Sequence, residues 1–303
     1  MHQWLDRQSD GGLSVVLFFA AGVWGLYWVP LRILEAGGLT DAWSVTVFNA
    51  CPLILLLPYA FLARHRLYPH LRNILLIGGL TGCGLSLYAT GLVASTVVRA
   101  TILFYLTPVW STIIGVLWLS ERLGAGRVAA ILLGIAGLAC LVIGSDDSTP
   151  PLNVGDVLAL LSGVFWGLGA AFMKRHPETP VGGSMACMIL VTAVISLGLG
   201  FLLFPDPFPS AAQLAGSLPV AVPASLIVLV PTAYLIMWIA RKLYPGRVGI
   251  LMMSEVLVAI LSASLFLPEE TMSVVQWVGA IAIILSCLVE VLFERKSGPV
   301  LSS

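Results

Sequence analysis

The sequence predicts an all-α integral membrane protein, with ten transmembrane helices arranged as two inverted five-helix repeats around a central cavity. Three observations predict this class: the composition, the ten apolar segments and a pattern shared by the two halves. Hydrophobic residues make up 59% of the 303 residues and charged residues only 10%, whereas about a quarter of an ordinary soluble domain is charged. The mean hydropathy is +1.01. Such a chain can supply about ten apolar helices of roughly 20 residues each.

Charge and cysteine content exclude several classes of protein. Fifteen Lys and Arg balance fifteen Asp and Glu, so neither a basic nucleic-acid-binding face nor an acidic tail is indicated. The five cysteines lie within apolar runs and share no motif spacing, which argues against a disulfide framework or a zinc site. We therefore expect no cofactor, no metal and no nucleic acid. The expected partners are a small solute and the lipid bilayer, with a monomer as the simplest assembly.

The ten apolar segments are separated by short breaks that carry turn-forming or charged residues, such as Gly37-Gly38, residues 146–151 and residues 205–209. Backbone polar groups in lipid must be hydrogen-bonded within their own segment, so each segment is expected to be a helix. Because the breaks are short, each helix should run antiparallel to the next. The expected helices are residues 12–32, 42–63, 71–92, 97–119, 125–144, 153–173, 181–203, 218–240, 246–267 and 273–293.

Prolines inside several of these segments should bend the helices, because a proline frees a carbonyl group one turn earlier and crowds it. The eighth segment has two such prolines and is a candidate hinge, although kinks that only shape the bundle are the alternative. The prolines so placed are Pro30, Pro52, Pro108, Pro223 and Pro231.

The distribution of Lys and Arg between alternate loops predicts the orientation. With the N-terminus in the cytoplasm, the inner segments hold thirteen Lys and Arg, and the outer segments hold only Arg32 and Arg99. Both termini are therefore expected to face the cytoplasm.

The two halves of the chain share a pattern. Trp24-Gly25 in the first segment matches Trp166-Gly167 in the sixth at an offset of 142 residues, and residues 99–121 match residues 247–269 at an offset of 148. Five spans are an odd number, so the second half must enter the membrane inverted. Inverted repeats of this kind are typical of secondary transporters, whose substrate site lies near the midplane between the halves.

These residues resemble a known family. The Trp-Gly pair in each half, Thr107-Pro108 in the fourth segment, and the glutamates Glu121 and Glu269 that close the fourth and ninth segments are similar to the EamA repeat of the drug/metabolite transporter superfamily. The resemblance covers residues 12–293 as two EamA-like units, which divide the chain into residues 1–148 and 149–303.

The resemblance implies a ten-helix bundle in which the first four segments of each half surround a central cavity and the fifth lies at the periphery. Members of the family export amino acids and other metabolites, or carry nucleotide-linked sugars and triose phosphates in organelles. One departure concerns Glu255, because Val256 follows it where the family often has proline. The helix break that a proline would cause is therefore in question at this position.

Enzymatic chemistry is not expected. All four histidines lie in loops or at the terminus, and the apolar segments contain no Ser/His pair, HExxH motif or paired carboxylates that could supply a base or a nucleophile. A phosphate-binding P-loop is also absent from the sequence, which argues against ATP as the energy source.

Glu255 is the one ionisable residue near the middle of a segment, and a charge there costs about 3 kcal/mol on insertion scales. It is a candidate ligand for a substrate ammonium or a proton carrier; the alternative is a structural hydrogen bond. Arg99, at the start of the fourth segment, could attract a carboxylate or extend to the interface.

Aromatic residues indicate the kind of solute. Four tryptophans fit the aromatic belts at the membrane interfaces, namely Trp28, Trp118, Trp238 and Trp277. Three others lie too deep in their segments to belong to such a belt, namely Trp24, Trp110 and Trp166. A cavity with aromatic walls and little fixed charge suits an aromatic or bulky neutral solute. The candidate cavity residues are Trp24, Tyr27, Tyr88, Tyr105, Trp110, Trp166, Tyr234 and Glu255.

The leading hypothesis is a secondary transporter that exports aromatic or other neutral amino acids, and similar small metabolites, across a bacterial inner membrane by alternating access. Within the superfamily, the aromatic amino-acid exporter branch is the most similar. The alternatives are a membrane receptor or scaffold that transports nothing, and a carrier for another metabolite class such as sugar nucleotides. That last class needs basic residues in the cavity, and no Lys or Arg lies deep in an apolar segment.

Overall fold

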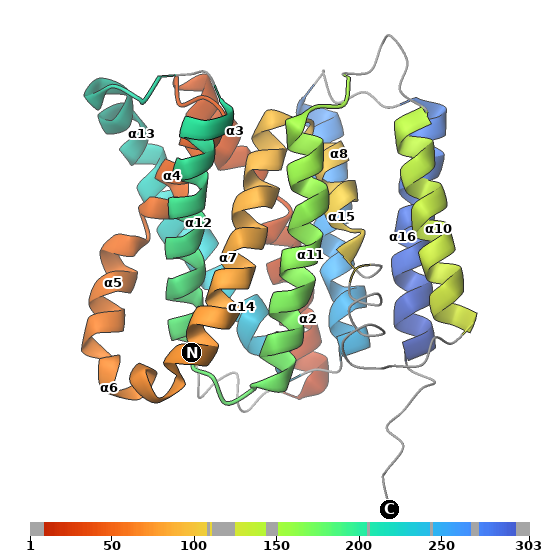
Figure 1. The fold of residues 1–303 in the computed structure, drawn as a ribbon, viewed down its shortest axis with the longest axis horizontal. Helices are drawn as coiled ribbons and strands as arrows, with labels where there is room; N and C mark the ends of the chain where they lie inside the picture. Colours follow the sequence, from red (N-terminus) through yellow and green to blue (C-terminus); the bar gives the residue numbers. More distant parts are fainter. Residues whose placement is uncertain are drawn as a thin grey trace, which may run out of the picture.

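A computed structural model describes residues 9–107, 110, 125–143, 151–204, 207–242, 245–267 and 273–294. Every regular element in these residues is a helix, which confirms the all-α prediction. The longer helices stand side by side in one bundle, with the α10 and α16 helices together at its right-hand edge (Figure 1).

The first half begins with two spans that are each divided into two helices. A long helix, α7, follows, and then the shorter α8. The helices are α2 (Asp10–Trp24), α3 (Trp28–Ala36), α4 (Ala42–Ala50), α5 (Leu53–Leu62), α6 (Arg64–Leu67), the 3₁₀ turn η1 (Tyr68–His70), α7 (Leu71–Ala94), α8 (Val97–Phe104) and α10 (Ala125–Ile143).

The second half has four long uninterrupted helices and one composite span that contains a π-helical turn. Its elements are α11 (Val154–Arg175), α12 (Val181–Leu203), α13 (Ala211–Ala224), the π turn η2 (Ser225–Leu229), α14 (Val230–Ala240), α15 (Pro245–Phe266) and α16 (Val274–Glu294). The predicted apolar segments coincide with these helices or consecutive groups of them, except that the structure describes only part of segment 97–119.

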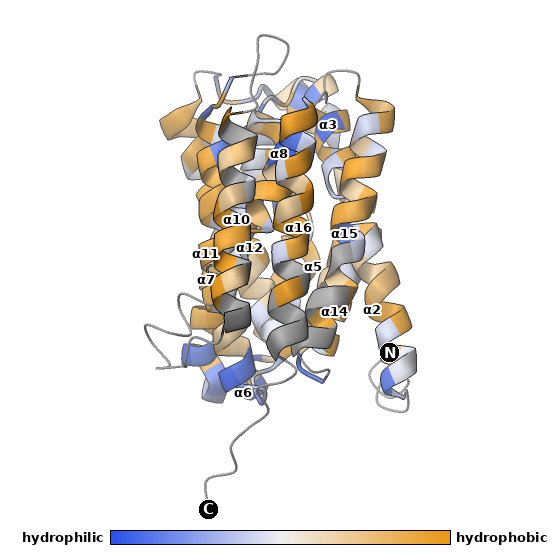
Figure 2. Cartoon of the chain, turned by 90° about the vertical axis from the view of Figure 1, so that its right-hand side faces the viewer, coloured by the Kyte–Doolittle hydropathy of each residue, from blue (hydrophilic) through white to orange (hydrophobic). Residues whose placement is uncertain are grey.

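By length and composition, five helices in the described residues can cross a membrane, or six if the bent pair α4 and α5 forms one span. Many large apolar side chains are exposed on the bundle, among them Phe19, Ile54 and Leu202. Figure 2 shows apolar residues along the lengths of the helices and the polar ones towards the ends, near α6 and α3. These features fit a protein surrounded by lipid, while ten crossings stay a prediction.

Prolines explain where the divided spans break. Pro30 has no N–H to donate to the carbonyl group of Leu26, four residues earlier, and the helix is interrupted between Trp24 and Trp28. At Pro52 the helices α4 and α5 meet at an angle of 44°. The kink expected at Pro52 is therefore confirmed, and the helix is interrupted just before Pro30. A π turn lies between Pro223 and Pro231, and Pro108 lies outside the described residues. In contrast, α15 runs without a break through Glu255 and Val256.

Helix pairing positions the interior of the bundle. The α7 helix packs against α11 and α12, while α2 packs against α14 and α15. Helices α10 and α16 pack mainly against each other. The buried hydrophobic core includes residues of α2, α7, α11, α12, α14 and α15.

Candidate functional site: a central cavity

A cavity of about 430 Å³ lies inside the bundle, bounded by side chains from α2, α7, α8, α11, α12, α14 and α15. Its walls are mostly apolar: four aromatic and three methionine side chains line it, namely Trp24, Tyr88, Phe104, Trp166, Met188, Met237 and Met252.

Glu255 is the one charged side chain among the described residues that line the cavity, and it is only 1% exposed. The Tyr105 hydroxyl donates to Glu255 Oε2 at 2.9 Å, and the Tyr88 hydroxyl donates to Oε1 at 3.4 Å. Each tyrosine also has a second partner: the carbonyl oxygen of Met252 lies 2.8 Å from the Tyr105 hydroxyl, and Thr101 Oγ1 lies 3.3 Å from that of Tyr88. Among the described residues, two tyrosines rather than a cation therefore hold this carboxylate.

Close helix packing places Glu255 against the first span. A methyl group added at Gly25 would lie 2.5 Å from the carbonyl oxygen of Glu255 and 3.1 Å from the amide nitrogen of Ala259. The hydroxyl of Ser254 donates to the carbonyl oxygen of Phe18 at 2.8 Å. Only a residue without a Cβ atom allows α15 to approach the end of α2 so closely.

The aromatic wall consists of two groups. Trp24 stacks on Tyr27 with ring centroids 5.5 Å apart, and Asn49 donates a 2.8 Å hydrogen bond to the Tyr27 hydroxyl. On the other side, Phe104 lies 4.6 Å from Tyr88 and 6.2 Å from Trp166, measured between ring centroids. Hence the two tryptophans of the Trp-Gly repeat face the same cavity.

The structure brings together half of the eight residues expected at the site. Trp24, Tyr88, Trp166 and Glu255 line the cavity. Tyr105 reaches it through its hydrogen bond to Glu255, and Tyr27 lies behind Trp24.

Trp110 and Tyr234 are not among the lining residues; both pack against the hydrophobic core. Sequence reasoning missed Phe104 and the three methionines. Phe104 directly precedes Tyr105, and the sequence does not show which of two adjacent side chains borders the cavity. The three methionines could not be distinguished from the other apolar residues of their segments, because the sequence does not show which helices pack together.

Two tryptophans expected in interfacial belts are buried instead. Trp28 and Trp238 are buried in the core, and Trp28 Nε1 donates to Ser262 Oγ of α15 at 3.1 Å. The first span breaks between Trp24 and Trp28, so the two side chains belong to different helices. Trp277 is 39% exposed, and Trp118 lies outside the described residues.

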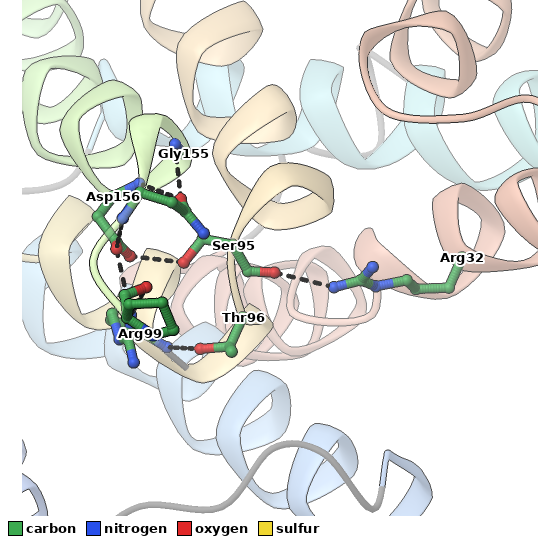
Figure 3. Close-up of polar contacts among 8 residues, drawn as sticks. Arg32, Ser95, Thr96, Arg99, Gly155 and Asp156 are labelled. Atoms are coloured by element: carbon green, nitrogen blue, oxygen red, sulfur yellow. Dashed lines mark hydrogen bonds and ion pairs between the residues drawn. The ribbon is translucent and has the colours of Figure 1, made fainter. Parts of the chain in front are cut away.

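A polar cluster closes one end of the bundle (Figure 3). Arg99 is 5% exposed, and its Nη1 lies 3.2 Å from Asp156 Oδ2 in a buried ion pair. The Ser95 hydroxyl donates to Asp156 Oδ1 at 2.5 Å. The interpretation of Arg99 as an arginine that extends to the interface was wrong, because Asp156 holds it inside the protein.

Asp156 is fixed by its own helix terminus. Asn153 and Asp156 form a capping box, in which the Asn153 amide donates to Asp156 Oδ2 at 2.9 Å. The Asn-x-x-Asp spacing before an apolar run is a signal that could have identified this site in the sequence.

Arg32 occupies the same end and caps α7. Its Nη2 donates to the carbonyl oxygens of Leu92 and Ser95, both at 3.1 Å, and its Nη1 pairs with Glu35 at 3.0 Å. Basic groups stabilise the C-terminal end of a helix, where carbonyl groups lack partners. The cluster thus ties α3, α7, α8 and α11 together.

A second cavity of about 210 Å³ lies towards the opposite end, lined by residues that include Met173, His176, Thr179 and Arg241. Met237 lines both cavities, so they are neighbours. Within the described residues, no group of three or more His, Cys, Asp or Glu is placed to hold a metal ion.

Comparisons with known proteins identify the family. The EamA-like transporter family matches residues 12–143 and, again, residues 153–292. The "Uncharacterized transporter YvbV" of Bacillus subtilis (strain 168) is 32% identical over 134 residues, which are 44% of this chain and 39% of that protein. The matched stretch therefore spans about two fifths of that relative's length.

A solved structure, titled "Crystal structure of protein", superposes on 96% of this chain and 100% of its own with a TM-score of 0.55 and 21% identity. That similarity concerns the fold alone. Since the family match covers most of the sequence, and the helices are apolar and bundled, this chain is a multi-pass membrane protein that belongs to the EamA-like transporter family.

Proposed function

We propose that this protein is a secondary carrier that exports aromatic or other neutral amino acids, and similar small metabolites, across the bacterial inner membrane by alternating access. The observation that carries the proposal is the buried central cavity, which is lined by Trp24 and Trp166 from the two halves of the chain. Its aromatic, nearly uncharged walls suit a solute with an apolar body.

Helix packing supports two inverted five-helix units, residues 1–148 and 149–303. If each span is matched to the span five later, the contact of α7 with α11 corresponds to that of α14 with α2. Likewise, the contact of α2 with α15 corresponds to that of α11 with α8. Two matched contacts are what a two-fold relation between inverted repeats requires.

The two ends of the bundle support alternating access. The Lys and Arg counts predict that Arg32 and Arg99 lie outside and the termini inside. The polar cluster at Arg32, Ser95, Arg99 and Asp156 then closes the outer end. In this orientation the second cavity, which shares Met237 with the central cavity, would lie on the cytoplasmic side.

Flux into liposomes tests the proposal. Purified protein in liposomes should carry labelled phenylalanine, tryptophan or threonine down a concentration gradient faster than protein-free liposomes do. A scaffold would move nothing. Robust flux of a sugar nucleotide, with none of an amino acid, would place the protein in another branch of the superfamily.

A further inference from the structure

Among the described residues, the wall of the central cavity contains an acidic group but no basic one. Among the described residues that line it, Glu255 carries a carboxylate and no Lys, Arg or His is present. Residues 108, 109 and 111–121, outside the described part, contain no Lys, Arg or His either. Arg32 and Arg99 are engaged by backbone carbonyl groups and by Asp156.

Hydrogen-bond donors at the carboxylate are already committed. A phenol has one hydrogen to donate, and the hydroxyls of Tyr105 and Tyr88 each lie between Glu255 and a second oxygen, of Met252 or Thr101. A solute carboxylate beside Glu255 would take a hydrogen from this arrangement and add a like charge. A primary ammonium group instead brings three hydrogens to a site rich in acceptor oxygens.

The cavity walls favour a cation in the same way. The faces of aromatic rings attract ammonium groups, and Trp24, Phe104 and Trp166 lie around the cavity that Glu255 enters. The side chains of Met188, Met237 and Met252 are flexible and apolar, and such side chains adapt to ligands of different shape.

From this geometry we infer that the central cavity recognises the amino group of its solute through Glu255 and contains no counterpart for a carboxylate. The preferred class is accordingly a primary amine with an aromatic or bulky apolar body, including amides and esters of amino acids. This inference rests on the proposed function and narrows its substrate class.

A matched set of four compounds tests the inference: 2-phenylethylamine, phenylalaninamide, phenylalanine and 3-phenylpropionate. All carry a phenyl ring on a short chain and differ in the amino and carboxyl groups. Equilibrium binding of labelled 2-phenylethylamine to the full-length protein in detergent, with the other three as competitors, measures recognition without requiring transport. Flux of the same compounds in liposomes measures carriage separately.

The two compounds with an amino group and no carboxylate should bind at least about tenfold more tightly than phenylalanine, and 3-phenylpropionate should bind most weakly. Glu255→Gln should remove the difference between the amine and the acid. Glu178→Gln, the same change at a loop carboxylate whose side chain is 52% exposed, should preserve it. If Glu255→Gln does not fold, the four compounds on the unmodified protein still decide the question.

The outcomes separate the two proposals. Amine-selective binding without flux would support the inference and count against a carrier. Phenylalanine or 3-phenylpropionate binding more tightly than 2-phenylethylamine would overturn the inference, whether or not the protein transports amino acids. Failure of 2-phenylethylamine to bind would also overturn it.

Discussion

At the residue scale, Trp24 and Trp166 differ from tryptophans that only fill a core. Trp24 packs on the ring of Tyr27 and Trp166 on that of Phe104, and each tryptophan also borders the cavity. Their spacing of 142 residues in the sequence becomes a shared boundary in space. A side chain that borders an empty volume contributes less to packing than a fully enclosed one, so its loss should affect solutes more than folding.

We therefore expect Trp24→Ala and Trp166→Ala each to lower transport by about tenfold, as truncation of an aromatic contact does at binding sites. Thermal unfolding in detergent should change less than for a fully enclosed tryptophan, whose truncation costs about 3–5 kcal/mol. Trp277→Ala, at an exposed position of α16, is the matched control and should leave both properties unchanged. Normal transport by both cavity variants would show that these rings are only structural.

How far the sequence predicts the site depends on the residue. Deep tryptophans and a lone carboxylate stand out against apolar segments, so Trp24, Trp166 and Glu255 were accessible to sequence reasoning. The hydrogen-bond partners of Glu255 could not be predicted, because the two tyrosines belong to other helices, α7 and the end of α8. Spacing within one helix does not reveal which other helices it meets, and for this reason Met188 and Met237 went unnoticed.

At the element scale, local chemistry set the helices and their breaks. The lengths of the apolar segments predicted the helices, and Pro30 and Pro52 lie at breaks that the structure contains. The π turn of residues 225–229 lies between Pro223 and Pro231, the two prolines of the eighth segment. Pairings such as that of α8 with α11 depend on long-range contacts, among them the buried ion pair of Arg99 with Asp156.

Asp156→Asn should destabilise the protein by about 3 kcal/mol, because it leaves the Arg99 charge buried without its carboxylate. The double variant Arg99→Gln/Asp156→Asn should recover part of that loss, since neither charge then remains. Thermal or denaturant unfolding of the purified proteins measures both effects. Equal stability of the single variant and the unmodified protein would mean that the pair does not hold α8 to α11.

At the scale of the whole molecule, the two halves of the chain pack around the central cavity. The polar cluster lies at one end of the bundle and the second cavity lies towards the other end. If the halves are inverted, each can rock against the other around a fixed site, and the cavity opens to one side at a time. We propose this motion as the way in which a solute crosses, because the family membership alone does not specify one.

Single-cysteine labelling tests that claim most directly. In a background without the five native cysteines, Ser148→Cys should react with a membrane-impermeant maleimide only from outside, and His65→Cys only from inside; these two positions calibrate the sides. Ala233→Cys, in the cavity wall, should react from either side, and a saturating transported solute should slow both reactions. Labelling of Ala233→Cys from one side alone under every condition, or reversed sides for the two calibrating positions, would contradict the account.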